Sequence, residues 1–169
     1  MAHGARTPRL TRAVPARLDR LFRVTRAVHA PFDGTGAARF GARWNSPGRP
    51  VIYAAGTYAG ALLEILVHAQ RPGLRVPYHC LVIDVPATAR IDVIAAGDVP
   101  GWDADDYVAS RAAGDAWLAA STSALLQVPA LTGYPHESHV LINPAHWDAK
   151  RLHLTGPHGV AWDPRLLTR

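Results

Sequence analysis

Residues 51–68, VIYAAGTYAGALLEILVH, join a short β-branched and aromatic run to the most apolar segment of the chain. Residues 51–53 predict a short strand, because such side chains fit a pleated, half-buried surface. Thr57 is a favourable N-cap, and the apolar spacing after it predicts a helix that continues to about Gln70 and ends at Pro72-Gly73. A strand that leads directly into a helix is therefore the centre of the predicted fold.

The predicted helix has two faces. Its core-facing side carries the apolar residues Tyr58, Leu62, Ile65, Leu66 and Ala69. The other side carries Thr57, Gly60, Glu64 and His68. Glu64 permits two interpretations. It marks a solvent-exposed stripe with His68 as its i,i+4 partner, or it lines a cleft in which apolar neighbours partly desolvate a carboxylate that does chemistry.

A strand and a glycine-rich segment come before this unit. Residues 21–27 alternate in polarity and predict a first strand, and residues 32–36 form a glycine-rich connection. The block GARWNSPG at 41–48 is typical of a loop whose glycines let the backbone approach a ligand. In this loop Arg43 offers a guanidinium fork for phosphate. The block matches neither a Walker loop nor a dinucleotide-binding fingerprint.

The elements that follow indicate an α+β fold. Residues 78–85 predict a strand, residues 97–107 a loop, and a second helix runs from Tyr107 or Ser110 to Ala124. Four further short strands are predicted at residues 125–128, 140–142, 151–154 and 159–162. This order is not a βαβ repeat. We therefore expect a single α+β domain with a mostly antiparallel, split or two-layer sheet and flanking helices.

Composition sets the broad class of the protein. Of 169 residues, 49% are hydrophobic and 18% are charged, which is enough apolar material for a folded core. No apolar run reaches the ~18 residues of a membrane span, so we expect a soluble cytoplasmic protein with no membrane partner. Cys80 is the only cysteine, which excludes a disulfide within the chain. We predict no metal site, because His136, His139, His146 and His153 lack accompanying cysteine or paired acidic ligands.

Positive charge is concentrated at one end of the chain. The net charge is +5, and seven arginines lie in the first 26 residues against one acid, Asp19. Residues 1–17 are interpreted as a basic, flexible N-terminal arm that precedes a domain of residues 18–169. Two interpretations of this arm are open. It is a solvated terminus without a specific role, or its arginines contact nucleic acid or an acidic partner.

In combination, these blocks resemble the RES domain over about residues 20–167. The shared motifs, in chain order, are LFRV (21–24), GA (36–37), GARWNSPG (41–48), VIYA (51–54), ALLEILVH (61–68), GD-x-WL (114–118), Val-Pro (128–129), Glu137, LINP-x-H (141–146) and D-x-RL (163–166). Two positions depart from the family: Ala130 replaces a serine, and His139 replaces an asparagine. Nearby hydroxyls that could replace the serine are Ser121, Ser123, Thr132 and Ser138, and spacing does not select one.

The resemblance implies an ADP-ribosyltransferase-like fold and the toxin of a toxin–antitoxin pair. Its expected partner is an Xre-like helix-turn-helix antitoxin, through which any nucleic-acid contact would be made. Members of the family consume NAD⁺, with water or phosphate as acceptor, so NAD⁺ is a substrate and no cofactor is expected. The alternatives are a protein ADP-ribosyltransferase on the same scaffold, or an impaired RES protein that acts as a binding partner because of Ala130.

Carried over by motif, the resemblance implies catalytic roles for Glu64, Arg43 and Tyr53. It implies substrate binding by Arg23, Arg43, Asn45 and Tyr53. Cleavage of the nicotinamide–ribose bond develops positive charge on the ribose, so the site must hold the diphosphate and place negative charge nearby. We expect both arginines to bind the diphosphate, Tyr53 to stack on or orient the nicotinamide, and Glu64 to bind ribose hydroxyls and stabilise the cation.

Overall fold

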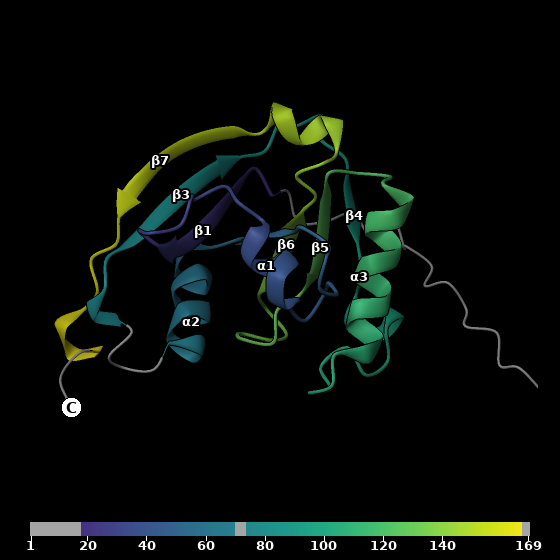
Figure 1. Ribbon diagram of the computed structural model, residues 1–169, viewed down its shortest axis with the longest axis horizontal. Helices are drawn as coiled ribbons and strands as arrows, with labels where there is room; N and C mark the ends of the chain where they lie inside the picture. Colours follow the sequence, from purple (N-terminus) through teal and green to yellow (C-terminus); the bar gives the residue numbers. More distant parts are fainter. Residues whose placement is uncertain (1–17, 70–73, 167–169) are drawn as a thin grey trace, which may run out of the picture.

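The computed structural model describes residues 18–69 and 74–166, whose strands form one curved seven-stranded sheet (Figure 1). The strands are β1 (Arg20–Arg26), β2 (Ile52–Ala55), β3 (Tyr78–Asp84), β4 (Ile91–Val93), β5 (Leu125–Pro129), β6 (Ser138–Ile142) and β7 (His153–Gly159). Their order is β4-β5-β6-β2-β1-β3-β7. Every neighbouring pair is antiparallel except β4 and β5, which are parallel. The predicted α+β class and mostly antiparallel sheet are confirmed.

Helices pack against this sheet at two places. The α-helices of the described residues are α1 (Thr35–Phe40), α2 (Tyr58–His68) and α3 (Val108–Ala120). Short 3₁₀ turns occur at Ala96–Asp98, Trp147–Arg151 and Pro164–Leu166. In Figure 1, β1, β3 and β7 arch over α2, whereas α3 lies beside β4 and β5. None of the described helices has the length and apolar character that a membrane span needs.

The predicted start of α2 is confirmed. The Thr57 hydroxyl accepts a hydrogen bond from the Gly60 amide, which satisfies one of the unpaired donors at the helix N-terminus. The helix ends at His68. The predicted stop signal, Pro72-Gly73, lies outside the described residues, as does the predicted arm at residues 1–17.

Alternate residues of a strand point to opposite faces of the sheet. At the centre of the sheet both sets are buried, each in its own apolar cluster. Ile52 of β2 and Ile142 of β6 belong to one buried cluster. Leu141 belongs to another, together with Trp44 of the glycine-rich loop and Trp117 of α3. Trp44 is 1% exposed. Burying a large apolar side chain stabilises the fold by about 1.5–3 kcal/mol, so Trp44 anchors this loop to the sheet.

The C-terminal strands differ from the prediction. In place of two strands at 151–154 and 159–162, the chain forms a 3₁₀ turn at Trp147–Arg151 and the single strand β7. β7 is an edge strand, and all seven of its residues are exposed. Neither face of β7 is buried, so its sequence has no alternation of apolar and polar residues from which its ends could be predicted.

Two elements lie where the sequence predicts none. The α1 helix occupies part of the predicted glycine-rich connection and buries no residue, so it has no apolar stripe. The β4 strand has only three residues, too few to show a period. The end of α3 is also earlier than the predicted Ala124, because Ser121 adopts a left-handed conformation (φ 47°) that terminates the helix.

Candidate active site

A cavity of about 610 Å³ opens between α2, β1, β2, the glycine-rich loop and the β5–β6 loop. Four predicted site residues line it: Arg23 from β1, Arg43 from the glycine-rich loop, Tyr53 from β2 and Glu64 from α2. The volume falls in the range typical of small-molecule sites. Of the two interpretations of Glu64, the cleft is therefore confirmed, and the residue does not mark a solvent-exposed stripe.

Three side chains surround the Glu64 carboxylate. Its Oε1 atom accepts hydrogen bonds from the Thr132 hydroxyl and from His139 Nε2, which lies 2.8 Å away. His68 places its Nδ1 atom 3.5 Å from Oε2 and 2.8 Å from the backbone oxygen of Glu64. Thr132 precedes β6 and His139 lies on it, and the antiparallel pairing of β6 with β2 brings both to α2.

These contacts keep the carboxylate ionised. Burial by itself raises the pKa of the Glu64 carboxyl, since it penalises the charged form. The hydrogen bond and charge of His139, then the Thr132 hydroxyl and the charge of His68, lower it by more. The net pKa of Glu64 is therefore below its ordinary value, and a negative charge is maintained on a partly desolvated wall of the cavity.

Thr132 and His139 are contacts that sequence reasoning did not select. Ala130, at the position of the family's serine, is 2% exposed and donates its amide to the Glu137 carbonyl. The hydroxyl beside Glu64 comes from Thr132 instead, two residues along the chain. The other hydroxyls in this region have different partners: Ser123 donates to Asp92 and Leu125, and Ser138 accepts from Gln127. Two sequence signals pointed to them: Thr132 is one of the four hydroxyls that could replace the family's serine, and His139 replaces the family's asparagine.

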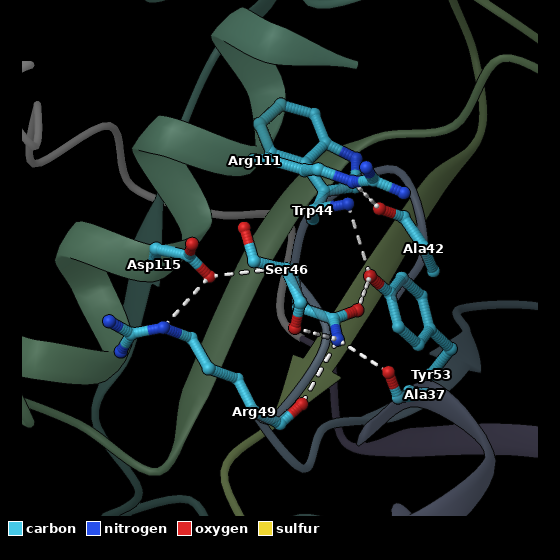
Figure 2. A network of polar contacts seen from close by, with 9 residues as sticks. Ala37, Ala42, Trp44, Ser46, Arg49, Tyr53, Arg111 and Asp115 are labelled. Atoms are coloured by element: carbon cyan, nitrogen blue, oxygen red, sulfur yellow. Dashed lines mark hydrogen bonds and ion pairs between the residues drawn. The ribbon is translucent and has the colours of Figure 1, made fainter. Parts of the chain in front are cut away.

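Tyr53 is hydrogen-bonded to two residues of the glycine-rich loop, Trp44 and Asn45. Figure 2 shows Tyr53 beside this loop. The Tyr53 hydroxyl donates to Asn45 Oδ1 over 2.8 Å and accepts from the Trp44 amide over 3.1 Å. Asn45 is fully buried, and its Nδ2 atom donates to the carbonyls of Ala37, Ser46 and Arg49. The Asn45 side chain is enclosed by the loop and does not line the cavity, and its contact with substrate stays a prediction. Burial raises the pKa of Tyr53 strongly.

The α3 helix supports the same loop from the other side. Figure 2 shows Asp115 and Tyr53 on opposite sides of the loop. Arg111 Nε donates to the Ala42 carbonyl over 2.9 Å, and Asp115 Oδ1 accepts from the Ser46 amide over 3.1 Å. A side chain on Gly114 would place its Cβ 1.8 Å from the Trp44 carbonyl oxygen. Only glycine therefore allows the helix to approach the loop so closely.

Backbone carbonyl oxygens and an aromatic ring hold the Arg43 side chain in the cavity wall. Its Nη1 atom donates to the carbonyls of Trp102 and Ala104, each over 3.1 Å. The guanidinium carbon lies 4.5 Å from the centre of the Tyr107 ring. Among residues 18–69 and 74–166 it pairs with no carboxylate, Glu64 included. Carbonyl oxygens orient the guanidinium without neutralising it, so Arg43 is suited to an anion.

Arg23 joins two segments of backbone at the cavity. It donates from Nε to the Pro31 carbonyl over 2.8 Å, from Nη1 to that of Tyr53 over 2.9 Å, and from Nη2 to that of Asp33 over 3.0 Å. Burial lowers the pKa of Arg23, and the charge of Asp33 partly opposes this effect. The bond to Tyr53 joins Arg23 to β2, and the other two join it to the segment between β1 and α1. The contact of Arg23 with a diphosphate stays a prediction.

The family is established by comparison with known proteins. The sequence model of the RES domain matches residues 20–163. This range includes most of the chain and all the residues of the cavity described above. The chain belongs to the RES domain family.

Named relatives are similar over most of their length. The "Prs ADP-ribosylating toxin" of Sphingobium sp. (strain YBL2) is 37% identical over 140 residues, which cover 80% of this chain and 86% of that protein. A "Toxin Res" of Photorhabdus laumondii is 35% identical over 128 residues, which cover 73% and 81%. The fold is similar to that in the crystal structure of the M. tuberculosis MbcT–MbcA toxin–antitoxin complex, with a TM-score of 0.71, 24% identity, and coverage of 88% of this chain and 86% of that chain.

Proposed function

We propose that this chain is the toxin of a toxin–antitoxin pair and that it consumes NAD⁺ by cleaving the nicotinamide–ribose bond. The observation that carries the proposal is the presence of Glu64 and Arg43 on the wall of one cavity. The names of the related toxins support the biological role. NAD⁺ is the substrate, and the proposed chemistry uses no bound cofactor.

The chemistry requires a fixed negative charge near the ribose. Nicotinamide is cationic in NAD⁺ and becomes neutral when it leaves with the electron pair of the C1′–N bond, so no proton is needed to release it. Positive charge then develops on the ribose. The ionised Glu64 carboxylate, held by Thr132 and His139, would stabilise this charge. A preorganised group of this kind lowers a barrier by about 3–4 kcal/mol.

The remaining cavity residues have complementary roles. Arg43 would bind the diphosphate, since its guanidinium is oriented but not neutralised. Arg23 adds a second positive charge while it holds the backbone of β2. The Tyr53 hydroxyl is occupied by Asn45 and Trp44, so the aromatic ring is the part of Tyr53 that is available to stack on nicotinamide.

A second candidate function is transfer of ADP-ribose to a protein side chain. It is favoured by the name of the Sphingobium relative, an ADP-ribosylating toxin. Both functions share the same bond cleavage and differ in the acceptor, which is phosphate or water in one case and a protein in the other. The third alternative, a catalytically impaired RES protein that acts as a binding partner, rested on Ala130. It is weakened because Thr132 supplies a hydroxyl to Glu64 in place of the family's serine.

The proposed partner is an antitoxin that restrains the enzyme in the cytoplasm. Similarity of the fold to a solved toxin–antitoxin complex supports such a partner. The Xre-like helix-turn-helix type follows from the family resemblance, and we assign contact with DNA to the antitoxin.

The test is to incubate the purified protein with NAD⁺ labelled in its adenylate part, with and without phosphate and cell lysate. Label in small products indicates phosphorolysis or hydrolysis, and label on protein indicates ADP-ribosylation. Glu64→Gln is expected to lower turnover by about 10²–10³-fold, because the charge is lost and the shape is kept. Arg43→Ala is expected to raise the KM for NAD⁺ strongly.

Asp84→Asn is a matched control, because this carboxylate pairs with Arg20 at an exposed site on the sheet. It should leave turnover unchanged. Thermal unfolding of each variant verifies that the fold is intact. A folded Glu64→Gln variant with wild-type turnover contradicts the proposal.

A further inference from the structure

The two carboxylate oxygens of Glu64 have unequal surroundings. Oε1 accepts two hydrogen bonds, from the Thr132 hydroxyl and from His139 Nε2. Oε2 has one polar neighbour within the described part of the chain, His68 Nδ1 at 3.5 Å. That nitrogen is closer to the backbone oxygen of Glu64, at 2.8 Å, and a carbonyl oxygen can only accept. The Nδ1 proton of His68 is therefore directed mainly at the backbone.

On the basis of the proposed function, we propose that Thr132 and His139 are positioning residues that hold Glu64 by Oε1 and reserve Oε2 for the substrate ribose. The two donors come from the segment that ends in β6, and the carboxylate comes from α2. This segment therefore sets the direction in which the helix presents its charge.

The capacity of a carboxylate oxygen explains the division between the two atoms. Each oxygen offers about two lone-pair sites, and on Oε1 both are occupied. A ribose hydroxyl would have to displace a donor from Oε1, but it can approach Oε2 directly. A flexible glutamate loses rotamer freedom when it is fixed in one orientation. Thr132 and His139 impose this ordering before the substrate arrives, which is the condition for effective electrostatic stabilisation.

The proton positions are consistent with this role. An ionised carboxylate only accepts, so His139 Nε2 carries a hydrogen in either charge state of the ring. The charged and titratable groups around the carboxylate are His139 on β6, His68 on α2, and, elsewhere on the cavity wall, Arg23, Arg43, Tyr53 and Tyr107. Of these, His139 and His68 contribute to the lowered pKa of Glu64.

The first experiment measures the pKa of the Glu64 carboxyl group by NMR and does not depend on enzyme activity. The chain contains only two glutamates, Glu64 and Glu137, so ¹³C-labelled glutamate gives two carboxyl signals that Glu137→Gln assigns. Titration of the wild type should give a Glu64 pKa below the ordinary value. Thr132→Val and His139→Phe should each raise it. Thr132→Ser, which keeps the hydroxyl, and His139→Gln, which keeps a donor near the Nε2 position, should restore most of the shift.

The second experiment measures NAD⁺ consumption by the same variants as a function of pH. Thr132→Val and His139→Phe should lower kcat by about tenfold to a hundredfold, the effect of losing a hydrogen bond to a charged group, with a smaller change in KM. The acidic limb of the pH profile should move to higher pH. Ser138→Ala is the control, since that hydroxyl accepts from Gln127 and should not affect kcat.

The two readouts separate this inference from the proposed function. An unchanged Glu64 pKa in folded Thr132→Val and His139→Phe variants overturns the positioning role, whatever the enzyme does with NAD⁺. A shifted pKa without NAD⁺ consumption by the wild type supports the positioning of Glu64 and contradicts the proposed function. If the valine or phenylalanine variant does not fold, Thr132→Ala and His139→Ala are titrated in its place.

Discussion

Asn45 shows how one buried amide organises a loop from the inside. Its Nδ2 group donates to three carbonyls and its Oδ1 atom accepts from Tyr53. A buried amide with these partners fixes the direction of the chain on both sides of it. Asn45 does not line the cavity, but it fixes the backbone of the loop from which Arg43, two residues earlier, extends into the cavity wall.

Tyr53→Phe should make the protein less stable at neutral pH and less sensitive to alkali. Loss of the hydroxyl leaves Asn45 Oδ1 and the Trp44 amide without this partner, at a cost of about 1–3 kcal/mol. In the wild type the raised pKa of Tyr53 keeps a proton in the folded state that the unfolded state releases. Stability should therefore fall as the pH rises above about 10, the ordinary pKa of tyrosine.

Urea denaturation at neutral and alkaline pH measures both effects. The variant should lack the part of the alkaline loss that Tyr53 causes. Tyr58, whose pKa is also raised by burial, contributes equally to both proteins. Identical alkaline curves for variant and wild type would rule out the assignment.

At the scale of elements, α3 acts as a rigid support for the cavity wall. Its residues Arg111 and Asp115 bond the backbone of the glycine-rich loop, and Gly114 lets the two surfaces touch. The loop lies between this helix and Tyr53 of β2. The position of Arg43 therefore depends on α3, which does not itself contribute the charges of the site.

Gly114→Ala should destabilise the protein and weaken NAD⁺ use together. The new methyl group would overlap the Trp44 carbonyl, so helix and loop must separate. Overpacking of this kind typically costs about 1–3 kcal/mol. Gly36→Ala in α1 is the control, because nothing lies within 4 Å of its added Cβ. Thermal unfolding should show a lower midpoint for Gly114→Ala and an unchanged or higher one for Gly36→Ala; equal midpoints would contradict the close approach.

The elements that sequence predicts well are those with a buried face. β1, β2, β3, β5, β6 and the start of α2 follow from apolar periodicity and capping. α1, β4 and β7 do not, since they are exposed or very short. The motifs identify Arg43 and Glu64, but Thr132 and His139 lie 68 and 75 residues from Glu64. Local periodicity contains no information on such distant contacts.

At the scale of the whole molecule, the cavity has two walls that come from different parts of the fold. One wall comes from α2 and the central strands, and the other comes from the glycine-rich loop backed by α3. A ligand that contacts both walls stabilises the native state by mass action, by about 2.7 kcal/mol at a hundredfold excess over its Kd.

NAD⁺ should therefore raise the thermal midpoint of Glu64→Gln, which binds substrate but scarcely cleaves it. Adding Arg43→Ala should remove most of that shift, because the proposed diphosphate contact is lost. Adding Arg20→Ala, at an exposed pair with Asp84, should leave it intact. Equal shifts in all three proteins would place the dinucleotide elsewhere.

Glu64 and its two hydrogen-bond donors, Thr132 and His139, are far apart along the sequence, which affects when the site can form during synthesis of the protein. When α2 leaves the ribosome, Thr132 and His139 have not yet been translated, and β2 has not met β6. Because both donors lie far along the chain, the carboxylate can be held by them only after β6 has emerged and paired with β2, late in synthesis. For the toxin proposed above, the antitoxin would be needed from the time at which this late part of the site is complete.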